Sequence, residues 1–415
     1  MNRDQSELRH QLWYAWCAAA GAITLLSAGC SLFQPAPNYS TTAKKSAPAA
    51  KVEAPLLPFP IATDRFTFDP EHEDVVGRVQ VTVATKEDTL PDLARRFNVG
   101  YEEIVRANPG VDPWLPGAGR EIVLPTQYVL PDAPRDGIVI NVAAMRLYYF
   151  PKHKKGEPAE VITHPIGIGK VGWQTPEGST VVVARVKDPV WIPPASVRKE
   201  HLEDGDVLPD KVDAGPDNPL GAYMFRLRWP SYLIHGTNKP YGVGMRSSHG
   251  CVRLYPEDIV ELYDSVPLGT TVRVVNQPYL LGWHGDELYV QAYGALEDDK
   301  RDWEHGPHPL AHKSSHSQAR LWKRIHAEDA AIDWDAAHAV AVAPRGVPVP
   351  VMKSHAPSQP QVVAQAVRVA NQLPVGASWD GNNAPAGDEG QFRDVMNARE
   401  PAAAATTAAD GAGSP

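Results

Sequence analysis

The stretch of residues 137–276 constrains the fold most, because short apolar runs recur along it between regularly spaced turns. Residues 137–142 and 145–150 are two such runs separated by a pair of alanines, which predicts a hairpin. Residues 181–186 and 272–275 are further β-branched runs, and glycine or proline interrupts the stretch about every 8–12 residues. This pattern is typical of sandwiches and barrels, so we expect a mainly β fold here.

A smaller unit is expected at residues 79–126, in the order β-α-α-β. Residues 79–83 alternate as a strand does, and the sequence Asp88-Thr89-Leu90-Pro91 indicates a helix start. A second short helix is predicted at 101–107, and residues 121–125 form the closing strand. These elements predict a compact module in front of the β-rich stretch.

Composition separates these parts from the rest of the chain, which contains 40 prolines and 32 glycines in 415 residues. Residues 31–78 are rich in proline, alanine, serine and threonine and are predicted to be a flexible tether. One more β-hairpin is expected at 277–299. Residues 300–415 are poor in aromatics and predict a largely disordered tail, in which 320–340 could form a short helix.

The beginning of the chain has the pattern of an export signal. Arg3 and Arg9 precede an apolar stretch at 12–26, and small residues then lead to Cys30. This end resembles a bacterial lipobox, which implies that residues 1–30 are a lipoprotein signal peptide and that Cys30 is lipidated. Ser31, and not an aspartate, follows Cys30. This resembles Gram-negative lipoproteins that are sorted to the outer membrane, so we expect a periplasmic protein anchored to the outer membrane of a Gram-negative cell. An ordinary cleaved signal with a chance cysteine, or an uncleaved anchor, are the alternatives.

Charge and cysteine content exclude other classes of protein. Lys and Arg total 40 against 49 Asp and Glu, a net charge of −9, which argues against nucleic acid as the main partner. The three cysteines, Cys17, Cys30 and Cys251, cannot build a disulfide framework. After removal of the signal and lipidation, Cys251 would be the sole free thiol.

That thiol lies in the segment with the densest chemistry. His235, His249 and Cys251 fall within 17 residues, with Gly236 and Gly250 beside the two histidines. A thiol is a weak nucleophile until a base takes its proton, and a neighbouring histidine can do this. The glycines allow a substrate to approach closely, and backbone amides near Gly250 and Cys251 could face a developing oxyanion.

Two less reactive interpretations compete with nucleophilic catalysis. A single cysteine is often a small buried hydrophobe, but the polar residues around Cys251 disfavour a core position. His235, His249 and Cys251 could instead bind zinc, although the sequence shows no clear further ligand. We therefore expect neither a metal nor another cofactor.

The residues around Cys251 closely resemble the signature of YkuD-type L,D-transpeptidases, in their Gram-negative, ErfK/YbiS-like branch. The resemblance rests on residues 235–237 and 248–254 and extends to 138–150 and 218–221. It implies a YkuD-type β-sandwich catalytic domain at 137–276. The unit in front of it resembles a LysM module, a family that binds the N-acetylglucosamine backbone of peptidoglycan.

The family's roles carry over to individual residues. Cys251 would be the nucleophile, His235 the proton donor and acceptor, and the Gly236 carbonyl would orient the His235 ring. His249 and Gly250 would shape the oxyanion and donor pocket. Arg253 would bind substrate, because its guanidinium suits a carboxylate. Four further residues are expected to bind substrate but are equally compatible with a structural role: Ser248, Ser247, Tyr232 and Trp191.

The implied reaction transfers the acyl group of diaminopimelate from a tetrapeptide stem to Cys251, with release of D-alanine, and then to an amine. An outer-membrane lipoprotein or porin is one candidate acceptor and is favoured by the domain order. A second diaminopimelate, giving a 3–3 cross-link, and water are the others. One alternative function is a non-catalytic lipoprotein that bridges membrane and peptidoglycan. Another is an NlpC-like amidase, in which the cysteine precedes its histidine, whereas here His235 comes before Cys251.

Overall fold

The computed structural model describes residues 57, 60–154, 156–302 and 319–374. The predicted signal peptide with Cys30, and most of the predicted tether, lie outside the described residues. Within the described part of the chain, no helix combines the length and the apolar character needed to cross a membrane.

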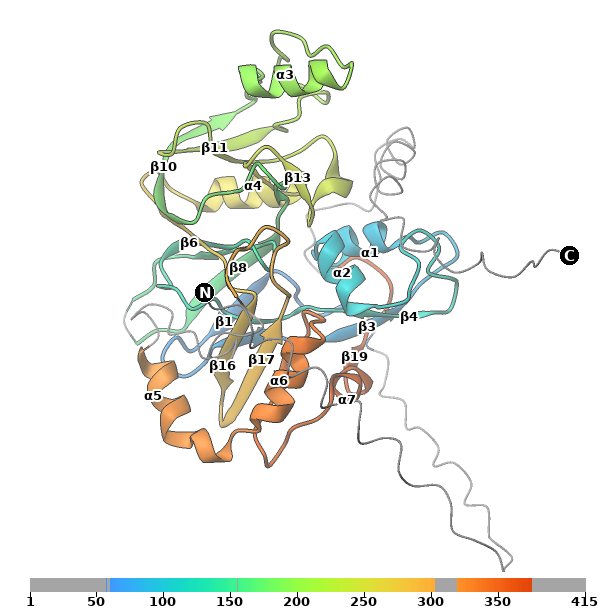
Figure 1. Cartoon of the computed structure of the whole chain (residues 1–415), viewed down its shortest axis with the longest axis vertical. Helices are drawn as coiled ribbons and strands as arrows, with labels where there is room; N and C mark the ends of the chain where they lie inside the picture. Colours follow the sequence, from blue (N-terminus) through green and yellow to red (C-terminus); the bar gives the residue numbers. More distant parts are fainter. Residues whose placement is uncertain (1–56, 58–59, 155, 303–318, 375–415) are drawn as a thin grey trace, which may run out of the picture. The chain divides into compact units, whose positions relative to one another are not determined.

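The described residues form a mainly β structure with short helices (Figure 1). The strands are β1 (Arg65–Phe68), β2 (Val75–Gly77), β3 (Gln80–Val83), β4 (Glu121–Leu124), β5 (Gln127–Val129), β6 (Gly137–Asn141), β7 (Arg146–Phe150), β8 (Ala159–Pro165), β9 (Ile168–Gly169), β10 (Gly178–Lys187), β11 (Tyr223–Leu227), β12 (Leu233–His235), β13 (Arg246–Ser248), β14 (Val252–Arg253), β15 (Thr271–Val275), β16 (Tyr279–His284), β17 (Glu287–Ala292), β18 (Val349–Pro350) and β19 (Val367–Arg368). The helices are α1 (Leu90–Arg96), α2 (Tyr101–Ala107), α3 (Ala195–Glu203), α4 (Pro256–Ser265), α5 (Ala319–Glu328), α6 (Trp334–Val342), α7 (Gln359–Ala364) and the 3-10 helices η1 (Pro240–Gly242) and η3 (Asp329–Ala331). The mainly β prediction is confirmed.

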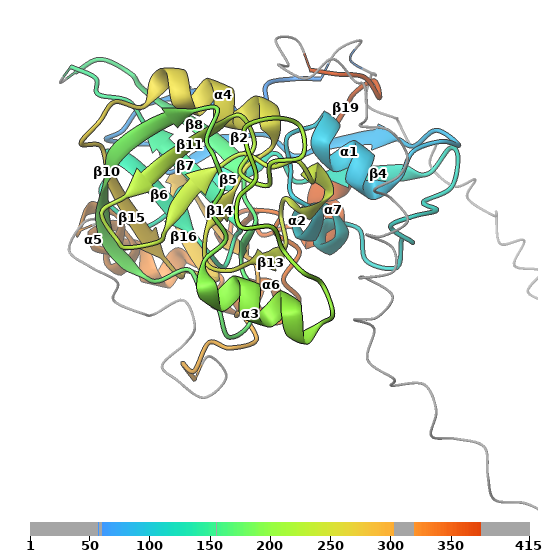
Figure 2. The same cartoon turned by 90° about the horizontal axis from the view of Figure 1, so that it is seen from above.

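The largest sheet runs in the order β1-β8-β7-β6-β15-β10-β11-β12-β14. The predicted hairpin is present as β6 and β7, which pair antiparallel with Ile140 opposite Leu147. Strand β10 is ten residues long, and its first part pairs with β15 while the rest pairs with β11. It therefore joins two halves of one sheet, which curls between them (Figure 2).

The main core fills the inside of this curl. Ile140 from one half of the sheet and Phe225 from the other belong to the same buried cluster. Ile259 and Leu262 of α4 join that cluster, so α4 closes the core along one side. The expected sandwich thus takes the form of one continuous sheet curled around its own core.

The expected β-α-α-β unit is present as β3-α1-α2-β4. Thr89 caps the N-terminus of α1: its hydroxyl accepts the Asp92 amide at 3.2 Å, and the Asp92 carboxylate accepts the Thr89 amide at 3.0 Å. Leu93, Ile104 and Ile122 lie in a buried cluster of this unit. The order of elements agrees with the sequence prediction.

The predicted tether at 31–78 is wrong at its described end. Strand β1 pairs antiparallel with β8, with Arg65 opposite Ile162. Phe68 is buried in a cluster with Phe150. The alternation of charged or polar and aromatic residues in β1 is a strand pattern that the proline-rich surroundings obscured, and pairing covers the otherwise open edge of β8.

The predicted disordered tail at 300–415 is wrong over residues 319–374, which form α5, η3, α6, β18, α7 and β19. The remaining ranges, 303–318 and 375–415, lie outside the described residues. The single short helix expected at 320–340 is replaced by α5 and α6, which η3 separates.

These C-terminal helices pack against the hairpin of β16 and β17, which the sequence predicted at 277–299 (Figure 1). Leu321 and Ile325 on one face of α5 are buried in a cluster with Trp283 of β16. Burying Trp283 requires a second layer over the hairpin, and α5 and α6 supply that layer. The low aromatic content of residues 300–415 suggested disorder because it did not reveal this packing.

The last strand extends the sheet of the small unit. Strand β19 lies parallel to β3, with Val367 opposite Gln80. The Thr82 hydroxyl donates to the Val369 carbonyl at 3.1 Å, across a sequence separation of 287 residues. Segments from both ends of the described chain therefore complete one small sheet.

A buried ion pair joins the small unit to the central sheet. Glu103 of α2 accepts from Arg146 of β7 at 2.8 and 2.9 Å, and their side chains are 3% and 0% exposed. Arg146 also donates to the Asn98 carbonyl at 2.9 Å, and its guanidinium carbon lies 4.2 Å from the centre of the Tyr128 ring. Removing one partner alone would leave the other charge buried without a counter-ion.

Replacing Arg146→Met should lower the free energy of unfolding by about 3–5 kcal/mol, because Glu103 loses its counter-ion. Arg198→Met is the matched control, since its ion pair with Asp210 is 40% and 101% exposed; its effect should stay below about 1 kcal/mol. Urea denaturation followed by circular dichroism measures both. Similar losses in the two variants would contradict the structural role of the buried pair.

Candidate active site

Cys251 immediately precedes β14, beside the strand that carries His235. Strands β12 and β14 pair in parallel, with Ile234 opposite Val252 and His235 opposite Arg253. Because side chains alternate along a strand, His235, Cys251 and Arg253 face the same side of the sheet. All three line one cavity.

This cavity has a volume of about 740 Å³. Its lining is made of Trp173, Val183, Val190, Trp191, Ile192, Pro194, Ser196, Val197, Pro219, Leu220, Met224, Arg226, Leu227, Arg228, Trp229, Pro230, Ser231, Leu233, His235, Ser248, His249, Cys251 and Arg253. Three of these residues are arginines, and none is an aspartate or glutamate. The cavity therefore favours an anionic ligand with some apolar surface.

The His235 ring is buried and is oriented by the backbone of the next residue. Its Nδ1 lies 2.6 Å from the Gly236 carbonyl oxygen, as the resemblance implied. A carbonyl oxygen only accepts, so Nδ1 carries the hydrogen and donates it. Burial, followed by the positive charge of Arg253, lowers the pKa of His235 to about 3. The ring is therefore neutral near pH 7 and able to accept a proton.

Cys251 is half-buried, and burial raises the pKa of its thiol. A backbone hydrogen bond from Leu233 and the charge of Arg253 oppose this rise. The Cys251 Sγ lies 3.7 Å from the Ser231 carbonyl oxygen. At rest the pair is a neutral thiol beside a neutral imidazole, so reaction requires a proton transfer between them or through the substrate.

The loop before Cys251 is fixed by three hydrogen bonds. Gly250 has φ +100°, and its carbonyl accepts from the Thr175 hydroxyl at 3.0 Å. Its amide donates to the Ser248 hydroxyl at 3.2 Å, and that hydroxyl donates to the Cys251 carbonyl at 2.6 Å. Because Ser248 already accepts the Gly250 amide, the Cys251 amide is the better candidate of the two expected oxyanion donors.

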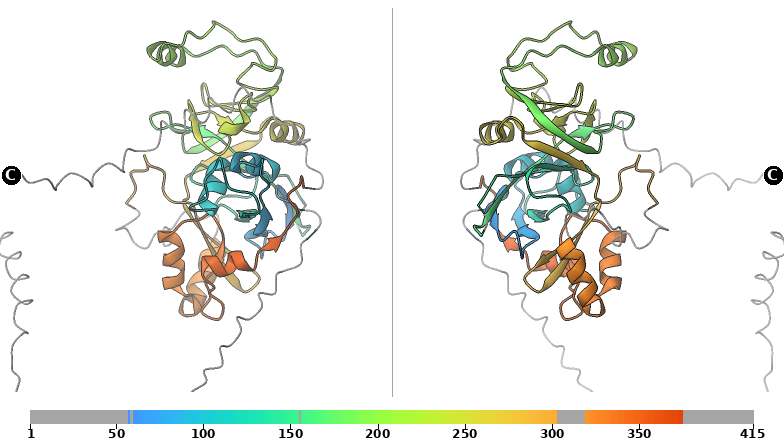
Figure 3. Two further views of the ribbon diagram at one scale, coloured as in Figure 1. Left: turned by 90° about the vertical axis from the view of Figure 1, so that its right-hand side faces the viewer. Right: turned by 90° about the vertical axis from the view of Figure 1, so that its left-hand side faces the viewer.

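His249 contacts the α3 arm, which is residues 188–222, the connection from β10 to β11 that carries α3. This arm stands away from the sheet (Figure 3). The His249 Nε2 lies 2.8 Å from the Glu200 carboxylate, which also pairs with Lys170. The Trp173 ring meets His249 edge-on, with 5.0 Å between ring centres. Burial lowers the pKa of His249, although Glu200 opposes this. His249 thus joins the wall of the cavity to the arm.

Comparison with known proteins gives a consistent result. A family model described as the L,D-transpeptidase catalytic domain, YkuD, matches residues 135–274. A probable L,D-transpeptidase ErfK/SrfK of Salmonella typhimurium is 44% identical over 244 residues, covering 58% of this chain and 77% of that protein. The chain belongs to the L,D-transpeptidase family. Two Escherichia coli proteins agree: the probable L,D-transpeptidases YcfS, 41% identical with 54% and 71% coverage, and YbiS, 39% identical with 60% and 79% coverage.

The L,D-transpeptidase cavity includes most of the residues expected from the sequence. His235, Ser248, His249, Cys251, Arg253 and Trp191 all line it. Gly236, Gly250, Tyr232 and Ser247 are absent from the lining. The Tyr232 ring lies against Gly250, where a Cβ would meet it at 2.9 Å. Among the described residues no three His, Cys, Asp or Glu side chains are grouped so that they could hold a metal ion.

The sequence did not indicate the arm residues of this L,D-transpeptidase. Glu200 and Ile192 lie on the α3 arm, and Trp173 lies on the loop after β9. None belongs to a motif, and Glu200 lies 49 residues before His249. The available signal was Ile192 itself, which follows Trp191 and is 68% exposed. Because Trp191 is half-buried and both residues line the cavity, the exposed Ile192 extends the apolar surface of the site.

Alkylation of Cys251 by iodoacetamide should have a pH midpoint above the ordinary thiol value of about 8.5, because burial raises its pKa. Arg253→Gln should move the midpoint higher still, because the variant loses a cation that favours the thiolate. Alkylation rates measured by mass spectrometry between pH 6 and 11 test this, with the urea-unfolded chain as reference. If the pH midpoint of the folded protein is at or below that of the unfolded chain, burial does not raise the pKa of the Cys251 thiol and the prediction is wrong.

Proposed function

We propose that Cys251 is the nucleophile and His235 the general base and acid of a two-step acyl transfer on peptidoglycan. L,D-transpeptidases act on peptidoglycan, which supplies the class of substrate. The observation that carries the proposal is the parallel pairing of β12 with β14. It places a neutral imidazole and a half-buried thiol on one face of a cavity lined with arginine.

In the first step the Cys251 sulfur attacks the carbonyl of diaminopimelate in a tetrapeptide stem. His235 takes the thiol proton as the C–S bond forms. The tetrahedral intermediate breaks its C–N bond, His235 returns the proton to the leaving amine, and D-alanine departs. The product is a thioester on Cys251.

In the second step an amine attacks the thioester carbonyl and forms a C–N bond while His235 takes its proton. The C–S bond then breaks, and His235 returns the proton to the Cys251 sulfur, which restores the thiol. The amine of a second diaminopimelate would give a 3–3 cross-link, and a lysine of an outer-membrane lipoprotein or porin would give covalent anchoring. Water would give carboxypeptidase activity. We favour anchoring, because the order of small unit, catalytic sheet and trailing hairpin resembles enzymes of that kind.

Arg253 is suited to hold a carboxylate of the donor stem. Its side chain lines the cavity, and its Nε is buried without a hydrogen-bond partner in the described structure. Its Nη1 donates to the Ser247 hydroxyl at 3.5 Å, which is a long hydrogen bond. A partly buried guanidinium without a paired carboxylate is costly, and an anionic substrate group would offset that cost.

The remaining parts are assigned by the same proposal. Residues 79–126 act as a LysM module that binds the glycan backbone, supported by the β3-α1-α2-β4 order. Cys30 carries a lipid that anchors the enzyme to the outer membrane, so that it works in the periplasm. The roles of Cys30 and of the membrane anchor rest on the sequence alone.

Wild-type protein incubated with disaccharide tetrapeptide should gain the mass of the stem minus D-alanine, and Cys251→Ala should gain nothing. His235→Gln should acylate at least about 100-fold more slowly, since it keeps the thiol but removes the base. Intact-mass spectrometry and D-alanine release measure both. An adduct of equal yield on Cys251→Ala, or wall binding with no adduct at all, would overturn the proposed chemistry.

Arg253→Gln should raise the KM for the tetrapeptide donor by about 10- to 100-fold, the range expected for a lost charge-assisted hydrogen bond. Arg228→Gln is the control, because Arg228 lines the same cavity but is exposed. A donor in which the diaminopimelate carboxylate is amidated should show the same loss in the wild type and no further loss in Arg253→Gln. Additive losses would assign Arg253 another role.

A further inference from the structure

Residues 95–103 of the small unit contact both ends of the segment that carries Cys251. At the upstream end, the first amides of α2 face a turn of the catalytic part. The Tyr101 amide donates to the Val243 carbonyl at 3.2 Å, and the Glu102 amide donates to the Gly244 carbonyl at 3.1 Å. Gly244 precedes β13, so this contact lies seven residues before Cys251.

The two backbones meet here at a pair of glycines. A Cβ on Gly100 would lie 2.8 Å from the Gly244 Cα, and a Cβ on Gly244 would lie 2.2 Å from the Tyr101 nitrogen. Gly244 also has φ +81°, which favours glycine. Direct backbone contact leaves no flexible side chain between the small unit and the segment, so a displacement of one displaces the other.

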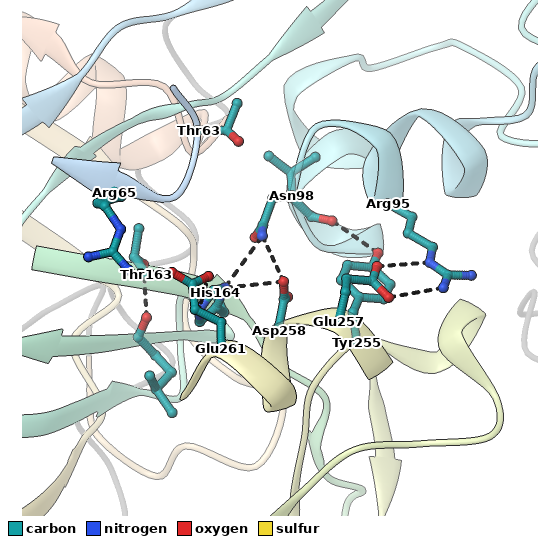
Figure 4. A network of polar contacts seen from close by, with 12 residues as sticks. Thr63, Arg65, Arg95, Asn98, Thr163, His164, Tyr255, Glu257, Asp258 and Glu261 are labelled. Atoms are coloured by element: carbon teal, nitrogen blue, oxygen red, sulfur yellow. Dashed lines mark hydrogen bonds and ion pairs between the residues drawn. The ribbon is translucent and has the colours of Figure 1, made fainter. Parts of the chain in front are cut away.

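At the downstream end, the same unit contacts the start of α4 (Figure 4). Arg95 donates to the two carboxylate oxygens of Glu257 at 2.9 and 3.0 Å. The Asn98 amide donates to Asp258 at 2.9 Å, and Asp258 is in turn 3.3 Å from the buried His164. These contacts lie six and seven residues after Cys251.

A further hydrogen bond reaches closer to the thiol. The Tyr255 hydroxyl donates to the Val99 carbonyl at 3.1 Å, and Tyr255 lies four residues after Cys251. The Arg146–Glu103 pair anchors α2 to β7 behind these contacts. The small unit is therefore bound to the sheet by buried charges and cannot swing away without breaking them.

We infer that residues 79–126 position the catalytic segment 245–254, with Gly100 and Arg95 as positioning residues for Cys251. This inference rests on the proposed role of Cys251. It assigns the small unit a task in the acyl-transfer step itself, in addition to any binding of glycan. A rigid support is needed because β14 is only two residues long and has one strand neighbour in the main sheet. Misplacing a reacting group by about 1 Å can lower a rate about 100-fold.

The first test compares two glycine substitutions in the full chain. Gly100→Ala introduces a methyl group against Gly244 and should lower the rate constant for Cys251 acylation by about 10- to 100-fold at saturating donor. Gly110→Ala strains the same unit at φ +78° but has no atom within 4 Å, so its acylation rate should stay within about 2-fold of wild type. Circular dichroism melting selects a temperature at which all proteins are folded.

A double-mutant cycle covers the case in which Gly100→Ala fails to fold. Arg95→Met and Glu257→Gln should each slow acylation, and the double variant should be no slower than the slower single variant. If the contact is merely structural, the cycle will show coupling in the melting temperature but not in the acylation rate of folded protein, and the inference is then wrong.

Failure of the inference differs from failure of the proposed function. If wild type forms no adduct on Cys251, as located by peptide mapping, the proposed chemistry fails. If wild type forms the adduct and Gly100→Ala, while folded, forms it at the wild-type rate, the positioning role alone is overturned.

Discussion

The parallel pairing of β12 with β14 is the contact on which the rest of this molecule depends. It is short, with two residue pairs, yet it sets which side chains face the cavity. Parallel neighbours need a crossover connection of a dozen or more residues. The sixteen-residue step from His235 to Cys251 is that connection, and it contains η1 and β13. The spacing of the motif is therefore a geometric requirement as well as a family signature.

So short a ladder is stable only through its surroundings. Antiparallel pairing of β12 with β11 supports one side, and Leu254 and Ile259 continue the chain into the main core. Thr175 and Ser248 fix the turn at Gly250 from behind. The polar site residues thus sit on a rigid apolar base, which is the arrangement that keeps reacting groups aligned without rearrangement.

Local patterns allowed much of this to be predicted. The β6–β7 hairpin, the Thr89 helix start and the β16–β17 hairpin each follow from nearby residues, and the structure confirms them. The contact of the His235 ring with the Gly236 carbonyl also agrees with what the family resemblance implied. The folded segment at 319–374 and the Glu200–His249 contact could not be predicted, because they depend on partners far away in sequence. The composition of residues 319–374 describes that segment by itself, whereas the segment is folded because it packs against the β16–β17 hairpin.

The addition of β19 to β3 has a consequence for the order in which this chain can fold. The Thr82–Val369 hydrogen bond spans 287 residues, so the sheet of the small unit lacks its third strand until residue 367 has been synthesised. Contacts of such long separation pay their loop-closure entropy before they gain stability, and they slow folding. A ribosome that stops before the last strand would release a chain with an intact thiol motif but an unfinished small sheet. The small unit can therefore be completed only after the ribosome has synthesised the chain as far as β19.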